Sequence, residues 1–288
     1  MMRGTYTWST DLNSLDGANP DQTVNYVSCH DNYTLFDQLN YTLADYTSVG
    51  GNTATPPASL EPNIIDVANA VVSAQATTMF ANSIAFMQGG EEILRTKSQP
   101  LELYDEKSHD SASTVRPNPD YPSYLDPNDE AMLSKYPEGQ VVSTGDVWMF
   151  GKIISHNSYN SSDETNSFKW DRKISVTQNG NRYDTSNVSP KFAQMIKEHK
   201  NVAKYGVGDN TNTDNISSWN TSSGSTVMAL AIGEYRIFFA GREGGTASFV
   251  GANNATLVFS SGLSGSAGVQ VTSTGITLPR LTFVVYKV

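Results

Sequence analysis

Near the beginning of the chain, an apolar segment ends in three side chains that can do chemistry. The segment VNYVSCHDN, residues 24–32, starts as a strand and closes with His30, Asp31 and Asn32. An imidazole, a carboxylate and an amide can bind and orient a polar ligand, and a carboxylate also stabilises positive charge. The structural alternative is a helix start, because Asp and Asn are favoured N-cap residues and the following YTLFDQLNYTL can form a short amphipathic helix.

A second pair of acids follows another apolar segment. IAFMQGGEEI, residues 84–93, is interrupted by two glycines and then presents Glu91 and Glu92. A helical pattern separates the two apolar segments, and the order strand, helix, strand implies a parallel pair with a right-handed crossover. Glu91 or Glu92 is then expected near the same rim as Asp31, which makes these acids candidates for a carboxylate pair.

The crossover helix has a clear start signal. In NIIDVANAVVSAQATTMFANS, residues 63–83, Asn63 can cap the helix and Asp66 lies in its first turn. One helical face carries the apolar side chains of Ile64, Val67, Val71, Ala74 and Phe80. The sequence therefore predicts an α/β unit of the kind found in α/β sheets and barrels.

Residues 98–155 change in character, because proline, aspartate and tyrosine accumulate there. This composition predicts a long ordered insertion or surface excursion. The next segment, SPKFAQMIKEHKNVAKYG, predicts a helix with Ser189 as N-cap, Pro190 at its first position and Gly206 as terminator. Its expected buried face carries Phe192, Ile196, His199 and Ala203, so His199 is expected to be structural.

From about Thr226 the hydrophobic period changes to two. Short β-branched segments separated by Gly, Asn and Ser predict an antiparallel β-sandwich. We expect a domain boundary near residue 205, with one domain over residues 1–205 and a C-terminal β-sandwich domain over residues 206–288. The predicted fold class is α/β plus all-β.

Charge and composition exclude several kinds of partner. The formal net charge is −10 and the 19 Lys and Arg residues form no basic run, so no nucleic acid partner is expected. No membrane span is expected, because no stretch approaches about 20 apolar residues. No signal peptide is recognised either. The single cysteine excludes an internal disulfide. Abundant Asn, Ser, Thr, Gly and Tyr are typical of bacterial carbohydrate-active proteins that are extracellular or on the cell surface, which is the location we expect.

Three segments together resemble one enzyme family. VNYVSCHDNYTLFDQL, FMQGGEEILRTK and HNSYNSSDETNSFKW occur in the order found in pullulanases, the type I alpha-1,6-debranching branch of the alpha-amylase superfamily of glycoside hydrolases. The resemblance covers about residues 1–205. It implies the C-terminal portion of a (β/α)8 catalytic barrel, with strands seven and eight, followed by a β-sandwich. The insertion at about 98–155 replaces a shorter link in the relatives.

The resemblance also implies roles for individual residues. Asp31 corresponds to the transition-state stabiliser, and His30 binds hydroxyls of the same sugar at the carboxyl end of a barrel strand. A fixed carboxylate suits this role, because the transition state resembles an oxocarbenium ion. Substrate contacts are implied for Asn32, Tyr159, Asn160 and Asp163. The implied substrate is an alpha-glucan such as pullulan, starch or glycogen.

One departure from the family concerns the remaining catalytic acids. A retaining glycosidase needs a nucleophile and an acid/base carboxylate about 5 Å apart, and the family carries them upstream of the His-Asp-Asn triplet. Only 29 residues precede His30, and they contain neither motif. The resemblance therefore implies a chain that lacks the N-terminal barrel portion and is inactive by itself. Glu91 and Glu92 are not expected to replace the missing acids, because the family uses these positions for loop support and substrate contacts.

Two other functions stay open at this point. The chain can be a non-catalytic glucan-binding or interaction module, or a subunit completed by a second polypeptide that carries the earlier strands. The His-Asp-Asn triplet is common to the whole superfamily, so it does not separate alpha-1,6 from alpha-1,4 preference. Many relatives bind calcium, but the sequence shows no carboxylate-rich loop that would identify calcium ligands.

Overall fold

The computed structural model describes residues 24–30, 32–44, 61–81, 84–100, 140–141, 147–149, 152–156, 158, 163–203, 216–219, 226–265 and 268–288. Three predicted site residues, Asp31, Tyr159 and Asn160, lie outside these ranges. The chain forms two compact units that alternate along the sequence. The first unit comprises Met1–Val27, Ala68–Met87 and Thr185–Val288, and the second comprises Ser28–Val67 and Gln88–Asp184. The domain boundary near residue 205 stays a prediction.

The first unit contains the predicted parallel strand pair. β1 (Val24–Asn25) pairs in parallel with β2 (Ile84–Ala85), with Val24 opposite Ile84. The amide of Phe86 extends this ladder by donating to the Asn25 carbonyl at 2.9 Å. The connecting helix α2 (Ile64–Met79) begins where the sequence predicts, because the Asn63 Oδ1 accepts from the amide of Ile65 at 2.9 Å. The strand, helix, strand prediction is confirmed.

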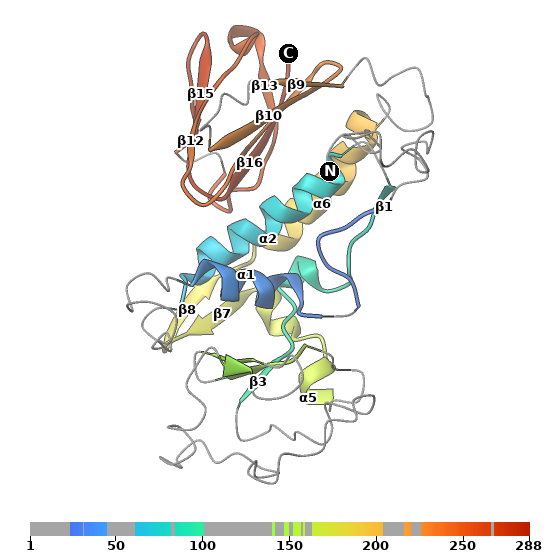
Figure 1. Cartoon of the computed structure of the whole chain (residues 1–288), viewed down its shortest axis with the longest axis vertical. Helices are drawn as coiled ribbons and strands as arrows, with labels where there is room; N and C mark the ends of the chain where they lie inside the picture. The colour runs from blue at the N-terminus through green and yellow to red at the C-terminus, as the bar shows by residue number, and fades with distance from the viewer. Residues whose placement is uncertain are drawn as a thin grey trace, which may run out of the picture. The chain divides into compact units, whose positions relative to one another are not determined.

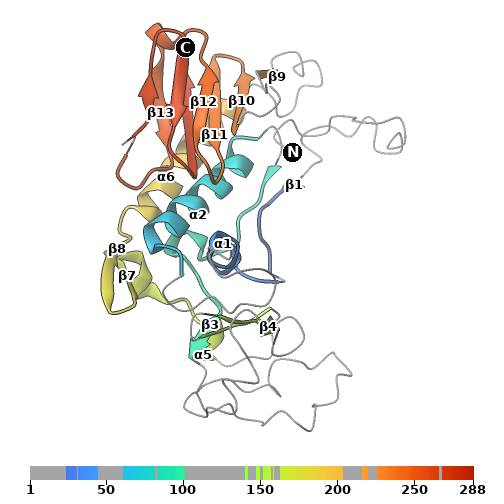
Figure 2. The same ribbon diagram turned by 60° about the vertical axis from the view of Figure 1, so that its left-hand side comes forward.

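The first unit also contains two antiparallel sheets, the helix α6 (Val188–Ala203) and the short helix η9 (Ala252–Asn254) (Figure 2). One sheet has the order β13-β16-β11-β10-β9, formed by Thr256–Ser260, Thr282–Lys287, Tyr235–Ala240, Val227–Ile232 and Ile216–Trp219. The other has the order β12-β15-β14, formed by Gly245–Ser248, Gly275–Leu278 and Gln270–Val271. The predicted antiparallel strands are confirmed, whereas β9 and β12 were not foreseen.

Both faces of the five-stranded sheet are covered. Phe238, Val284 and Tyr286 on one face share a hydrophobic core with Ile276 and Leu278 of the smaller sheet. On the other face, the ring of Phe283 stacks on Phe80, at a centroid distance of 5.7 Å. Helices α2 and α6 run side by side (Figure 1). Double burial explains why β16 is a nearly continuous apolar run rather than an alternating one.

Helix α6 differs from its prediction at the cap and in the buried face. The Lys191 amide donates to the Asn187 carbonyl at 3.2 Å, so Ser189 lies within the first turn instead of capping the helix. Ile196 is 45% exposed, and the buried positions are Val188, Phe192, Met195 and Val202. The predicted helical repeat of apolar residues is confirmed, but the predicted buried face is wrong in part. The sheet that α6 packs against decides which side chains are buried. His199 is structural as predicted, since its Nδ1 hydrogen-bonds to the Met79 carbonyl.

The second unit combines short helices with small antiparallel sheets. Its helices are α1 (Leu35–Leu43), η5 (Glu91–Ile93), α5 (Asp163–Asn166) and η7 (Trp170–Lys173). A hairpin joins β7 (Ser175–Gln178) to β8 (Asn181–Asp184). The described part of the insertion forms an antiparallel sheet of order β3-β6-β5-β4, from Ser98–Pro100, Lys152–Ile154, Val147–Met149 and Gln140–Val141. Among the described residues, no helix is long and apolar enough to cross a membrane.

Candidate functional site

The loop between β1 and α1 carries the described members of the His-Asp-Asn triplet. His30 and Asn32 are exposed, and Asn32 adopts a left-handed conformation with φ 63°. Thr34 caps α1, because its Oγ1 accepts from the amide of Asp37 at 3.2 Å. The helix-start alternative for the triplet is therefore wrong, since capping is done by a residue that follows it.

A buried carboxylate lies beneath this loop. Asp37 is 1% exposed, and its Oδ2 accepts from the Thr34 hydroxyl at 2.9 Å and from the Lys97 amide at 2.7 Å. Its Oδ1 accepts from the Thr96 hydroxyl. These bonds satisfy a buried charge and join α1 to the segment that follows η5. Sequence reasoning missed Asp37, because an acid in the first turn of a helix is ordinarily a surface residue.

Lys97 connects the triplet loop to the HNSYNSSD segment. Its side chain is buried, at 3% exposure, and its Nζ donates to the carbonyls of Asn32 and His156, the latter at 2.6 Å. The ring of Tyr33 also meets the imidazole of His156 edge-on, at a centroid distance of 5.2 Å. Two segments that are far apart in the sequence are thus adjacent in the second unit.

Asp163 lies at the surface on the continuation of this segment. It is exposed and begins α5, where its carbonyl accepts from the Ser167 amide at 2.7 Å. The Nδ2 of Asn166 donates to the Ser158 carbonyl at 2.6 Å. The structure therefore brings Asn32 beside the start of this segment and leaves the Asp163 side chain accessible.

Glu91 is held inside the second unit. It is 3% exposed, and its Oε1 accepts from the hydroxyl of Ser28, which directly precedes Cys29 and His30. Burial raises the pKa of Glu91 to about 7, although hydrogen bonds from Ser28 and the Gln88 backbone act in the opposite direction. Glu92 instead caps the turn, because its Oε2 accepts from the Gly90 amide at 2.9 Å. Neither acid is presented as an exposed carboxylate.

The turn that precedes these acids requires a glycine. Gly90 has φ 99°, and a Cβ atom there would lie 2.5 Å from Cε1 of Phe168. The guanidinium of Arg95 lies over the same ring, 5.2 Å from its centroid. Arg172 stabilises the end of this turn, because its Nε donates to the Leu94 carbonyl at 2.8 Å. Packing and the positive φ therefore both favour glycine at position 90.

The pH dependence of stability tests the buried state of Glu91. The pKa is raised in the folded chain, so stability is complete below about pH 4.5 and falls as the pH rises to about 7, by about 3 kcal/mol. Glu91→Gln should abolish this decline and unfold at higher denaturant concentration than the wild type at pH 8, measured by urea titration at pH 5 and pH 8. Glu92→Gln is the control and should keep the decline. Equal pH profiles for Glu91→Gln and the wild type would contradict the burial of a titrating acid.

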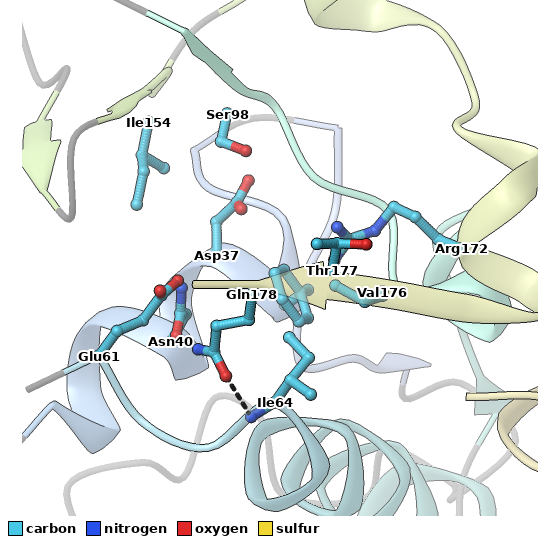
Figure 3. Close-up of a pocket in the computed structure, with 11 residues that line it drawn as sticks. Asp37, Asn40, Glu61, Ile64, Ser98, Ile154, Arg172, Val176, Thr177 and Gln178 are labelled. Carbon is cyan, nitrogen blue, oxygen red and sulfur yellow. Dashed lines mark hydrogen bonds between the residues drawn. The ribbon is translucent and has the colours of Figure 1, made fainter. Parts of the chain in front are cut away.

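The second unit contains a small pocket that none of the described site residues lines. The residues that line this pocket are Phe36, Asp37, Asn40, Glu61, Ile64, Ser98, Ile154, Arg172, Val176, Thr177 and Gln178 (Figure 3). Its volume of about 20 Å³ is far below that of a typical ligand site. Gln178 fixes the start of α2, because its Oε1 accepts from the Ile64 amide at 3.1 Å and its Nε2 donates to the Pro62 carbonyl at 2.8 Å. We interpret this pocket as part of the packing and not as a sugar site.

The described ranges contain no group of three or more His, Cys, Asp or Glu side chains that could hold a metal ion. A buried charge of the second unit is instead the guanidinium of Arg172. Burial lowers the pKa of Arg172, and the charge of Asp37 partly restores it. The guanidinium of Arg172 also lies over the ring of Phe36, 4.4 Å from its centroid.

Comparison with known proteins gives one consistent group of relatives. No protein-family model matches the chain. A pullulanase of Klebsiella aerogenes is 36% identical over 98 residues, which are 33% of this chain and 8% of that protein. Among solved structures, the Group B Streptococcus pullulanase SAP in complex with maltotetraose has a TM-score of 0.62 at 18% identity, covering 93% of this chain and 32% of that one. The catalytic module of the pneumococcal glycogen-degrading virulence factor SpuA, in complex with an inhibitor, has a TM-score of 0.61 at 17% identity, covering 93% and 36%.

These relatives confirm the resemblance recognised in the sequence. The chain is pullulanase-like in sequence over a third of its length and in fold over most of it. It spans less than a tenth of the curated relatives that it matches, since the alignment covers 8% of their length. It spans about a third of the solved chains, with 32% and 36% of their length covered.

Proposed function

We propose that this pullulanase-like chain carries the part of an alpha-glucan-debranching hydrolase that holds the sugar beside the scissile alpha-1,6 linkage. One observation carries the proposal: a single buried ammonium, that of Lys97, binds the main chain at both Asn32 and His156. It joins the triplet loop to the HNSYNSSD segment, and these are the two segments whose side chains the resemblance assigns to sugar binding.

The proposed roles follow from the chemistry of the side chains. The Asp31 carboxylate stabilises the positive charge of the oxocarbenium-like transition state in a retaining mechanism. His30 and Asn32 bind hydroxyls of the same sugar, while Tyr159 stacks on a neighbouring sugar and Asn160 and Asp163 bind its hydroxyls. The nucleophile and the general acid come from barrel strands that this chain does not contain. The substrate is pullulan, starch or glycogen.

An apolar face on β1 and β2 supports the barrel part of the proposal. Val24, Tyr26, Ile84 and Phe86 are 49%, 53%, 46% and 43% exposed. They lie on one face of the parallel pair, because side chains alternate along each strand and Val24 is opposite Ile84. Parallel sheets are normally buried on both faces, and a closed barrel would bury this one in its interior. We therefore propose that β1 and β2 are barrel strands seven and eight.

The isolated chain should not hydrolyse pullulan, because two of the three catalytic acids are absent from it. Reducing-sugar release should equal that of a buffer blank, while maltotetraose should still bind, as detected by calorimetry. Turnover that disappears in Glu91→Gln or Glu92→Gln would contradict the proposal and assign the chemistry to these acids.

A second candidate function is a non-catalytic glucan-binding module, which would need the two segments that Lys97 joins but no nucleophile or general acid. Reading the genomic DNA upstream of the codon for Met1 separates the two. An in-frame stretch that encodes both motifs would support the hydrolase. A stop codon next to a ribosome-binding site would favour the binding module, or a subunit completed by another polypeptide.

A further inference from the structure

We propose that Lys97 is a positioning residue that sets the spacing between the two sugar-binding loops. The pair of hydrogen bonds from its Nζ to the Asn32 and His156 carbonyls is called the Lys97 clamp below. The inference rests on the proposed function for the identity of the ligand, although the clamp itself does not depend on it.

The clamp is built from a buried charge and main-chain acceptors. An ammonium has three donors and no acceptor, and at 3% exposure it is costly unless oxygen atoms surround it. Both of these oxygens are carbonyls, so the clamp acts on the backbone of the two loops. Charge-assisted bonds of this kind are stronger than neutral ones.

The backbone of Lys97 is itself fixed on both sides. Its amide donates to Oδ2 of Asp37 at 2.7 Å, and its carbonyl accepts from the Ser155 amide at 3.4 Å. The hydroxyl of the preceding residue, Thr96, donates to Oδ1 of Asp37 and accepts from the Ser98 hydroxyl at 2.7 Å. The backbone of Lys97, just before β3, is therefore held by hydrogen bonds. This restricts the position of the ammonium to which both loops bind.

This arrangement couples the two loops. Asn32 has a left-handed backbone, which asparagine tolerates, and its carbonyl is held by the Lys97 ammonium. A ligand that contacts both loops gains affinity when their spacing is set before binding, because less ordering is then needed. Loss of the ammonium should release both loops at once, although they are more than a hundred residues apart in the sequence.

The test compares maltotetraose affinity in variants of the full chain by calorimetry. Lys97→Met keeps most of the apolar stem and removes the charge, so affinity should fall at least tenfold. Lys97→Arg keeps charge and donors and should recover part of the loss. Lys191→Met is the matched control, because the Lys191 ammonium also binds a main-chain carbonyl, that of Ser260, but in the first unit. The maltotetraose affinity of Lys191→Met should stay within twofold of that of the wild type.

A second measurement tests the clamp in the unmutated chain and without sugar. In ¹⁵N-lysine-labelled protein, the Lys97 ammonium protons should exchange with water at least tenfold more slowly than those of the exposed Lys200. Failure of the wild type to bind maltotetraose would defeat the proposed function alone, and the ammonium exchange would then decide on the clamp. Fast exchange at Lys97 would overturn the inference, as would wild-type affinity in a folded Lys97→Met variant.

Discussion

Asp31→Asn is expected to lower the turnover of pullulan about a thousandfold in a polypeptide that joins this chain to the nucleophile and acid strands. That factor corresponds to about 4 kcal/mol in the activation barrier. An amide is nearly the same size as a carboxylate but carries no charge, so it cannot stabilise the developing oxocarbenium ion. The measurement is kcat from reducing-sugar release, with thermal unfolding to verify that the variant folds.

Two further variants separate this catalytic role from a structural one. Thr34→Ala removes the side chain that caps α1 and should lower the unfolding free energy by about 1 kcal/mol, with a much smaller loss of turnover. His30→Ala should raise KM as well as lower kcat, because its proposed role is to bind sugar hydroxyls. Near-normal turnover in Asp31→Asn would defeat the assignment of Asp31 as transition-state stabiliser.

Asp37→Ala is expected to lower the unfolding free energy by about 3 to 5 kcal/mol, the largest stability effect that the described structure suggests. The substitution leaves the Thr34 hydroxyl, the Thr96 hydroxyl and the Lys97 amide without their buried acceptor. It also removes the negative charge that favours the ionised form of the buried Arg172 guanidinium. Urea titration at pH 7 measures the loss.

Matched variants identify the origin of this effect. Asp171→Ala removes an exposed acid from the same unit, beside Arg172, and should change the unfolding free energy by no more than about 0.5 kcal/mol. Asp37→Asn keeps one acceptor oxygen and should give an intermediate loss. A loss below about 1 kcal/mol in Asp37→Ala would show that water replaces the carboxylate and that the network is not a determinant of stability.

The sequence alone determined the features that local interactions encode. Asn63 caps α2 through its own side chain, and period-two segments after residue 226 became antiparallel strands. The parallel pairing of β1 and β2 was also predictable, since a strand, helix, strand order leaves few other topologies. The family resemblance rested on long segments in a fixed order, and the comparisons confirmed it.

The tertiary structure decided which polar groups are buried and what they contact. Nothing near Lys97 in the sequence shows that its ammonium binds the carbonyls of Asn32 and His156, because both acceptors are main-chain atoms brought in by the fold. Glu91 and Glu92 are neighbours of the same type, yet only Glu91 is buried. That burial raises the pKa of Glu91 to about 7. The buried stripe of α6 likewise depended on the sheet beside it. Periodicity and capping act over a few residues, whereas burial and the choice of partner are set by segments that meet only after the chain has folded.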